Sequence, residues 1–331
     1  MKMKRLHLED IKKLVHGASR VEEVDGRIEL HRFTKEQQEI YRIASPDDYY
    51  VKSFSTSGIS LEFDTDSEYL GLSVSICKGS SRRFFAHSIF VEGERIGELS
   101  GEIESGAANV PFEKGFQLKS GMKRVRIVMP WSVDSKIVGL ELDENAEVIP
   151  VKKSLKMLMF GDSITQGYDA MQPENAYAVQ IATRLNAEAI NKGIGGERFR
   201  PTLASLKDEI EPDLITVAYG TNDWANSTKE EFELACKEFY RNLRHSYPNV
   251  KIYAMAPIWR SSLNDKKPIG EPLSYIAEYI KEVAKEVSDM NVIDCFDFIP
   301  HELENFQTDG LHPIDAGFEH YAKNLWKVLG K

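Results

Sequence analysis

A serine flanked by two glycines follows an apolar run near the middle of this chain of 331 residues. The apolar residues 157–160 end in Gly161 and Asp162, Ser163 comes next, and a second glycine, Gly167, stands four residues after the serine. A buried strand that stops at a tight turn presents the following side chain at the edge of its sheet. Ser163 can therefore be a helix cap, a phosphate ligand or a nucleophile.

The glycine spacing around Ser163 does not fit two well-known serine motifs. A nucleophile elbow has the pattern G-x-S-x-G, whereas Gly167 comes too late for it. A phosphate loop has the pattern G-x-x-x-x-G-K-[ST], but Tyr168 follows Gly167 here. The sequence also contains no H-E-x-x-H or H-x-H pattern, so it does not predict a metal-dependent deacetylase.

Two polar residues near the end of the chain complete a set that fits acyl transfer. A serine hydroxyl is a weak nucleophile until a base takes its proton. His312 is suited to be that base, because imidazole titrates near neutral pH. Asp309, three residues earlier, can hold one ring nitrogen of His312 while the other faces Ser163. The residue types therefore predict a triad of nucleophile, base and orienting carboxylate.

Such a serine also needs hydrogen-bond donors for the oxyanion that develops during attack. Three candidates are the backbone N–H of Ser163, a glycine N–H in the segment NKGIGGE (residues 191–197) and the side-chain amide of Asn222. Loss of one such donor typically raises the barrier by about 2.7–4 kcal/mol. We therefore expect Asn222 to matter nearly as much as the base.

These residues lie far apart in the sequence, and a parallel sheet is the element that can bring them together. From Leu155 onward, apolar strand candidates alternate with helical segments, which is typical of a parallel sheet covered on both faces. Ligands bind beyond the carboxyl ends of the strands in such sheets. The candidate strands are residues 155–160, 187–191, 214–220, 251–257 and 291–295.

The first half of the chain has a different periodicity. Between about residues 25 and 150, apolar and polar residues alternate, and turn residues recur about every ten positions, as expected for many short antiparallel strands. We predict a jelly-roll-like β-sandwich with a short N-terminal helix over residues 1–150, and a catalytic α/β domain over residues 151–331. The sandwich either binds glycan or builds a wall of the cleft.

Four blocks of the second half, in this order, resemble those of the SGNH (GDSL) hydrolases. GDSI at residues 161–164 is similar to the GDSL block, with isoleucine in place of leucine. NKGIGGE is similar to the second block and aligns its glycine with Gly196, GTND matches the third block at Asn222, and DGLHP matches the last at Asp309 and His312. The resemblance implies a flavodoxin-like three-layer α/β/α fold and a serine esterase mechanism. It further implies an oxyanion hole of Ser163, Gly196 and Asn222, with no metal or other cofactor.

The two-part layout is similar to that of two-domain bacterial carbohydrate esterases, which deacetylate sugars. In that family aromatic residues near the site contact the sugar, which makes Trp224 and Trp259 candidates here, with Arg198 and Arg260 as further ones. We expect a serine esterase that removes acetyl groups from carbohydrate esters. Two alternatives stay open: a lipid esterase or thioesterase of the same family, and a non-catalytic glycan-binding protein.

Composition restricts the partners that this chain can have. A formal net charge of -10 disfavours nucleic acid and anionic membrane surfaces. The sequence shows no secretory signal and no apolar run of roughly 18 residues. Its three widely spaced cysteines suit a reducing compartment. These features predict a cytoplasmic protein whose partner is a small-molecule or oligosaccharide acyl ester, with a homo-oligomer left open.

Overall fold

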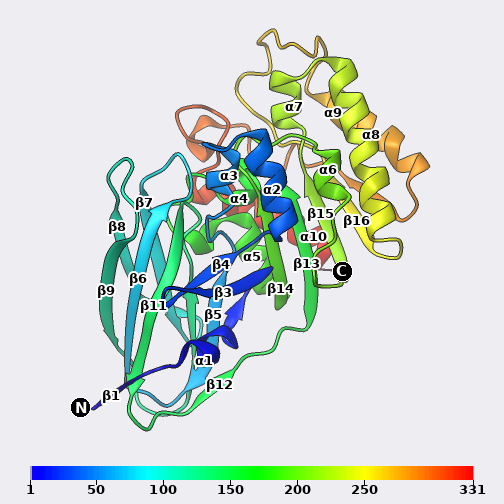
Figure 1. Ribbon diagram of the computed structural model, residues 1–331. Helices are drawn as coiled ribbons and strands as arrows, with labels where there is room; N and C mark the ends of the chain where they lie inside the picture. The colour runs from blue at the N-terminus through cyan, green and yellow to red at the C-terminus, as the bar shows by residue number, and fades with distance from the viewer. Residues whose placement is uncertain (1, 331) are drawn as a thin grey trace.

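Two antiparallel sheets of six strands each build the first half of the chain in the computed structural model, which describes residues 2–330 (Figure 1). One sheet has the order β3-β4-β11-β6-β9, with β1 beside β11, and the other has the order β12-β5-β10-β7-β8, with β2 beside β5. The first sheet consists of β1 (Met3–Arg5), β3 (Arg20–Val24), β4 (Arg27–His31), β6 (Tyr69–Lys78), β9 (Val110–Gln117) and β11 (Val133–Asp143). The second consists of β2 (Val15–His16), β5 (Ser60–Thr65), β7 (Phe84–Val91), β8 (Glu94–Glu102), β10 (Lys123–Val128) and β12 (Val148–Pro150).

The alternation of apolar and polar residues along the strands places an apolar core between these two sheets. On β6, Leu72 and Val74 point inward and are each 1% exposed, and on β5, Leu61 and Phe63 are fully buried in the same core. Because side chains alternate between the two faces of a strand, one face of each sheet is apolar and covers the other sheet. The predicted antiparallel sandwich is confirmed.

Three helices accompany the sandwich: α1 (Leu8–Lys12), α2 (Lys35–Ala44) and α3 (Tyr49–Lys52). The predicted N-terminal helix is short because the chain turns into β2, which pairs with β5. The sequence analysis misses α2 and α3. A capping box begins α2: the Gln37 N–H donates to Thr34 Oγ1 at 3.2 Å, and the Thr34 N–H donates to Gln37 Oε1 at 3.1 Å.

Five parallel strands form the sheet of the second half, in the order β14-β13-β15-β16-β17. Relabelled in chain order this is 2-1-3-4-5, the flavodoxin-like order that the family resemblance implies. The strands are β13 (Leu155–Gly161), β14 (Ala187–Gly193), β15 (Leu214–Ala218), β16 (Lys251–Met255) and β17 (Met290–Ile293). All five strand candidates of the sequence analysis are therefore strands, with small differences at their ends.

Helices cover both faces of this sheet, as the side chains of the interior strand β13 show. Leu158 and Phe160 pack into the core beneath α8 and α9, whereas Met157 and Met159 pack on the other face beneath α5 and α10. None of the helices described among residues 2–330 is long and apolar enough to cross a membrane. The helices are α4 (Ser163–Gln166), α5 (Tyr177–Arg184), α6 (Pro201–Ala204), α7 (Thr221–Asn226), α8 (Lys229–Ser246), α9 (Ser274–Glu286) and α10 (Asp315–Leu329), with 3-10 turns at Pro173–Asn175 and Leu303–Asn305.

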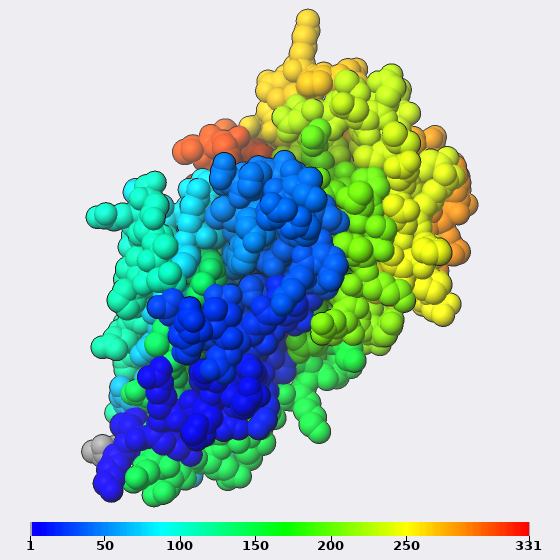
Figure 2. Space-filling model, in the orientation of Figure 1, coloured from blue at the N-terminus to red at the C-terminus, as the bar shows by residue number. Residues whose placement is uncertain are grey.

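The N-terminal half packs directly against the parallel-sheet half, as the blue and green surfaces of Figure 2 show. Phe33 and Tyr41 are fully buried in the same core as Phe160 of β13. The guanidinium of Arg32 is also fully buried, and its Nη1 donates to the carbonyl oxygens of Asn191 at 2.7 Å and of Gly193 at 2.8 Å. The sandwich side therefore satisfies backbone groups at the carboxyl end of β14.

Candidate active site

Ser163 stands just beyond the carboxyl end of β13, as the first residue of α4. Asp162 caps this helix, because its Oδ1 accepts a hydrogen bond from the Ile164 N–H at 2.9 Å. The chain passes close to itself at Gly161, where an added Cβ would lie 2.0 Å from Thr165 Oγ1. Glycine is therefore needed at that position for the strand to turn so sharply into the serine.

Asp162 is a structural residue rather than a second catalytic acid. Burial raises its pKa to about 6, although the hydrogen bond from Ile164 and the nearby charges of His312 and Arg260 oppose the rise. Its carboxyl group is occupied by the cap of α4. The side chain thus holds the turn that presents Ser163.

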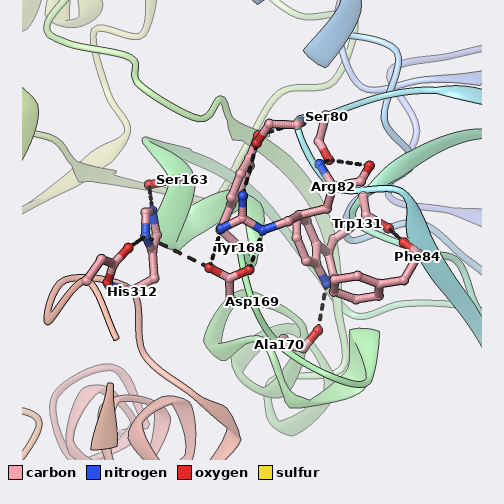
Figure 3. Close-up of polar contacts among 12 residues, drawn as sticks. Ser80, Arg82, Phe84, Trp131, Ser163, Tyr168, Asp169, Ala170 and His312 are labelled. Atoms are coloured by element: carbon pink, nitrogen blue, oxygen red, sulfur yellow. Dashed lines mark hydrogen bonds and ion pairs between the residues drawn. The ribbon is translucent and has the colours of Figure 1, made fainter. Parts of the chain in front are cut away.

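Ser163, His312 and Asp309 form one continuous chain of hydrogen bonds, in which Figure 3 labels Ser163 and His312. Ser163 Oγ lies 2.8 Å from His312 Nε2, and Asp309 Oδ2 lies 2.6 Å from His312 Nδ1. Serine and histidine are 149 residues apart in sequence, and the end of β13 and the loop before α10 bring them together. The three residues therefore have the spatial relation that a nucleophile, a base and an orienting group require.

A turn before His312 holds the Asp309 carboxylate in place. Its Oδ1 accepts hydrogen bonds from the N–H groups of Leu311 at 2.9 Å and His312 at 3.0 Å. Burial by itself would raise the pKa of Asp309, but the hydrogen bond with the His312 ring and these two backbone bonds outweigh it and hold the pKa well below its usual range. Asp309 is therefore a carboxylate at neutral pH, and an acceptor at Nδ1 favours the tautomer whose Nε2 can take the proton of Ser163.

The candidate oxyanion donors follow neighbouring strands. In the sheet register, Gly161 of β13 lies beside Gly193 of β14 and Ala218 of β15, so the segments that follow these strands start at one edge. Ser163, Gly196 and Asn222 lie two, three and four residues beyond those positions. The three candidates thus come from adjacent strand ends.

The loop that contains Gly196 is anchored to Asn222. Gly196 has φ +87°, which strains any other residue, and its carbonyl accepts a hydrogen bond from Tyr49 Oη at 3.1 Å. The Asn222 side-chain amide donates to the carbonyl of Glu197 at 3.0 Å, which leaves its second N–H free to donate elsewhere. Among the hydrogen bonds of residues 2–330, none is donated by the backbone N–H of Ser163 or Gly196.

Trp224 does not lie where a substrate could reach it. Its side chain is 1% exposed, its Nε1–H donates to the Glu271 carbonyl at 2.9 Å, and the Arg260 guanidinium lies 5.3 Å from its ring centroid. The predicted substrate contact of Trp224 is therefore wrong, and the residue belongs to the core. In a helix, residues two apart point to different sides, so a face that presents Asn222 turns Trp224 away from it.

The other three candidate substrate contacts are held by protein groups. Trp259 stacks on His301, with ring centroids 5.2 Å apart and an interplanar angle of 12°. Arg260 donates to Thr221 Oγ1 at 3.0 Å, and Arg198 donates to Ser227 Oγ at 2.8 Å. Their contact with substrate stays a prediction.

The sequence analysis misses three residues around His312 (Figure 3). The Tyr168 ring stacks against the His312 ring at a centroid distance of 5.7 Å, and Asp169 Oδ2 lies 4.0 Å from His312 Nδ1. Arg82 of the sandwich binds both oxygens of the Asp169 carboxylate, at 2.7 Å and 2.9 Å. Tyr168 and Asp169 follow the serine block directly, so their position offered a signal, whereas nothing local pointed to Arg82.

Oxygen and nitrogen atoms of Asp169, Asp309 and His312 lie within 4.8 Å of one another, which raises the question of a metal. Both oxygens of Asp169 are engaged by the Arg82 guanidinium, and both ring nitrogens of His312 are engaged by Asp309 and Ser163. A cation would have to displace a positively charged side chain from this group. The donor set therefore does not fit a metal ion.

Comparisons with known proteins agree with the fold. Residues 159–320 match the GDSL-like lipase/acylhydrolase family. No curated protein matches the chain in sequence. Among solved structures, a salicylyl-acyltransferase, SsfX3, from a tetracycline biosynthetic pathway is similar with a TM-score of 0.81 at 18% identity, over 96% of this chain and 93% of that one.

Two carbohydrate esterases share the whole two-part fold. A family two carbohydrate esterase from Cellvibrio japonicus has a TM-score of 0.66 at 17% identity, over 99% of this chain and 98% of that one. The acetyl xylan esterase Est2A from the rumen bacterium Butyrivibrio proteoclasticus has a TM-score of 0.64 at 18% identity, over 99% and 97%. The resemblance seen in the four sequence blocks is thereby confirmed, since residues 159–320 match the model of the GDSL-like lipase/acylhydrolase family.

Proposed function

We propose that this protein is a serine ester hydrolase in which Ser163 is the nucleophile, His312 the general base and Asp309 the orienting carboxylate. The observation that carries the proposal is the unbroken path from Ser163 Oγ through the His312 ring to Asp309, with bonds of 2.8 Å and 2.6 Å. The match of residues 159–320 to the GDSL-like lipase/acylhydrolase family supports the same reaction class.

The reaction passes through an acyl-serine. His312 Nε2 takes the proton of Ser163 as Oγ attacks the ester carbonyl carbon, and the carbonyl oxygen becomes an oxyanion. The backbone N–H groups of Ser163 and Gly196 and the amide of Asn222 donate to that oxyanion. The C–O bond to the alcohol breaks, and the alcohol leaves with the proton from His312. Water then attacks the acyl-serine with His312 again as base, which releases the carboxylic acid and restores Ser163.

We further propose an acetylated carbohydrate as the substrate. The support is architectural: the two-part fold is shared over 99% of the chain with a carbohydrate esterase and with an acetyl xylan esterase. The sandwich also reaches the site, since Arg82 contacts Asp169 beside His312. The same similarity favours a role of the sandwich in forming the cleft.

Transfer of the acyl group to an alcohol other than water is a second candidate function. The similarity to a salicylyl-acyltransferase, with a TM-score of 0.81, supports it. Hydrolysis and transfer can share an acyl-serine and differ only in whether water or an alcohol accepts the acyl group. Incubating the protein with an ester and a competing sugar alcohol distinguishes the two. Acetate as the only acyl product indicates hydrolysis, whereas an acylated sugar alcohol indicates transfer.

Acetate release from a panel of acetylated oligosaccharides tests the proposed substrate, alongside 4-nitrophenyl acetate and octanoate. We expect acetate release from at least one oligosaccharide and a higher kcat/KM for the acetate ester than for the octanoate ester. A preference for the octanoate would favour a lipid esterase or thioesterase. Absence of both hydrolysis and labelling by a serine-reactive fluorophosphonate would favour a glycan-binding protein and contradict the proposal.

Asn222→Ala should lower kcat by about 10²–10³ with little change in KM, because the amide donates to an oxyanion that exists only in the transition state. Steady-state kinetics on 4-nitrophenyl acetate measures this. Asn226→Ala is the matched control, since Asn226 lies on the same helix, is exposed, and donates to the Asn222 carbonyl at 3.0 Å. Equal effects of the two substitutions would assign Asn222 a role in the helix rather than in the reaction.

A further inference from the structure

A loop of the sandwich places a cation next to the catalytic histidine. Residues 79–83 connect β6 to β7, and Arg82 extends from this loop to the segment that follows α4. Its Nε donates to Asp169 Oδ1 at 2.7 Å and its Nη2 donates to Asp169 Oδ2 at 2.9 Å, a bidentate pair that Figure 3 shows beside His312. Only 6% of Asp169 is exposed, so solvent does little to screen its carboxylate.

Two carboxylates therefore face one ring nitrogen. Asp309 Oδ2 lies 2.6 Å from His312 Nδ1, and Asp169 Oδ2 lies 4.0 Å from the same atom. A single N–H at Nδ1 can be given to one of them. The structure gives it to Asp309, while Asp169 is bound on both oxygens by a guanidinium.

The segment around Asp169 is held rigidly enough for this distinction to persist. Asp169 has φ +69°, an uncommon conformation for a residue with a side chain. The Trp131 indole N–H, also from the sandwich, donates to the Ala170 carbonyl at 2.9 Å. Between these contacts the Tyr168 ring lies with the Arg82 guanidinium 5.5 Å from its centroid and stacks on His312.

We propose that Arg82 is a positioning residue of the active site: it cancels the charge of Asp169, so that Asp309 alone orients His312. The proposal rests on the proposed function, because it gives His312 the role of general base. It adds that the sandwich supplies a residue on which the pH dependence of the reaction depends.

The expected effect has a definite sign. Without Arg82, the Asp169 carboxylate 4.0 Å from Nδ1 is uncompensated and stabilises the imidazolium. His312 then keeps its proton up to a higher pH, and it can act as a base only above that pH. In Asp169→Asn, with Arg82 kept, the positive charge of Arg82 is no longer balanced. This excess charge destabilises the imidazolium and moves the transition of His312 to lower pH. At that distance, and with a carboxylate that solvent screens little, the displacement is at least about one pH unit.

Other charged groups also face His312, and these residues are left unchanged in every variant. Asp309 lies on its own loop, and Asp162 faces it from the end of β13, with Arg260 in turn near Asp162. Burial raises the pKa of Asp162 to about 6, so this group titrates in the same region. None of these residues is hydrogen-bonded to Arg82 in residues 2–330, but the charge of Asp309 acts on Arg82, so the double variant separates the loss of the Arg82 charge itself from the loss of its compensation of Asp169.

The experiment compares Arg82→Ala, Asp169→Asn, the double variant Arg82→Ala/Asp169→Asn and Arg82→Lys with the unmodified chain. Arg83→Ala is the matched control, because Arg83 is the next residue and its exposed side chain pairs with Glu102, at 3.0 Å. Two readouts are taken: the titration midpoint of the His312 ring by NMR on histidine-labelled protein, and the acid limb of kcat/KM for 4-nitrophenyl acetate. The first needs no turnover, so it separates this proposal from the proposed function.

We expect Arg82→Ala to move both readouts up by at least about one pH unit, and Asp169→Asn to move them down. The double variant and Arg82→Lys should stay close to the unmodified chain, as should Arg83→Ala. An unchanged midpoint in folded Arg82→Ala, or the same upward displacement in the double variant, would overturn the proposal. A displaced NMR midpoint in a protein that hydrolyses no ester would uphold it and contradict only the proposed function.

Discussion

Ser163→Ala is expected to reduce ester hydrolysis to a residual level, with kcat lowered by about 10⁶. The Oγ atom that attacks the ester is lost, and with it the proton that His312 takes in the general-base step. The fold should persist, because Ser163 Oγ bonds only to His312 in residues 2–330 and the cap of α4 comes from Asp162. Hydrolysis of 4-nitrophenyl acetate measures the loss, and circular dichroism with a thermal melt measures the fold.

Ser205→Ala serves as the control for Ser163→Ala. Ser205 is exposed just after α6, and its hydroxyl donates to the Thr202 carbonyl far from the triad in sequence. This variant should retain full activity and full labelling by a fluorophosphonate. If Ser163→Ala kept more than a hundredth of the activity with an unchanged melt, another residue would have to be the nucleophile.

Asp309→Asn should lower kcat by about 10⁴, the second largest effect that we expect. An amide nitrogen in place of Asp309 Oδ2 donates to Nδ1 instead of accepting from it, so the ring turns to the tautomer with a proton on Nε2 and cannot take the proton of Ser163. The loop should survive, because an asparagine oxygen can still accept from the N–H groups of Leu311 and His312. Steady-state kinetics over a range of pH gives the measurement.

Asp297→Asn provides the control for Asp309→Asn, since Asp297 forms another aspartate–histidine pair, with His301 at 3.1 Å, in which the carboxylate is largely exposed. It should leave kcat unchanged. Retention of more than a tenth of the activity by Asp309→Asn would assign the orienting role to Asp169, the other carboxylate near Nδ1. Asp169→Asn would then be the more damaging of the two substitutions.

Much of the candidate site follows from local sequence. Strand ends are visible as apolar runs that stop at glycine, and in a parallel sheet the ends of neighbouring strands share one edge, so residue order alone groups Ser163, Asn222 and His312. The spacing of Asp309 and His312 also indicated their contact, because one turn of the chain brings residues three apart together. The same reasoning predicted the sandwich, because a period of two belongs to strands.

The failures share a cause. Trp224 lies two residues beyond Asn222, and only the helical conformation of α7 turns the two side chains to different sides. The helix α2 lies within a half of the chain whose overall pattern indicates strands, although Thr34 and Gln37 form a capping box that could have revealed it. The domain boundary, the compartment and the partners stay predictions.

The sequence by itself predicted the reaction class, the candidate triad and the two-part architecture, because each depends on residue types and on periods that are visible over a few positions. The tertiary structure decided which carboxylate lies within hydrogen-bond distance of His312 and which cation pairs with the other one. Arg82 and Asp169 are 87 residues apart and lie in different halves of the chain, so their contact depends on how two folded halves pack. Packing of this kind leaves no periodic pattern in the sequence, and it placed a residue of the sandwich close to His312.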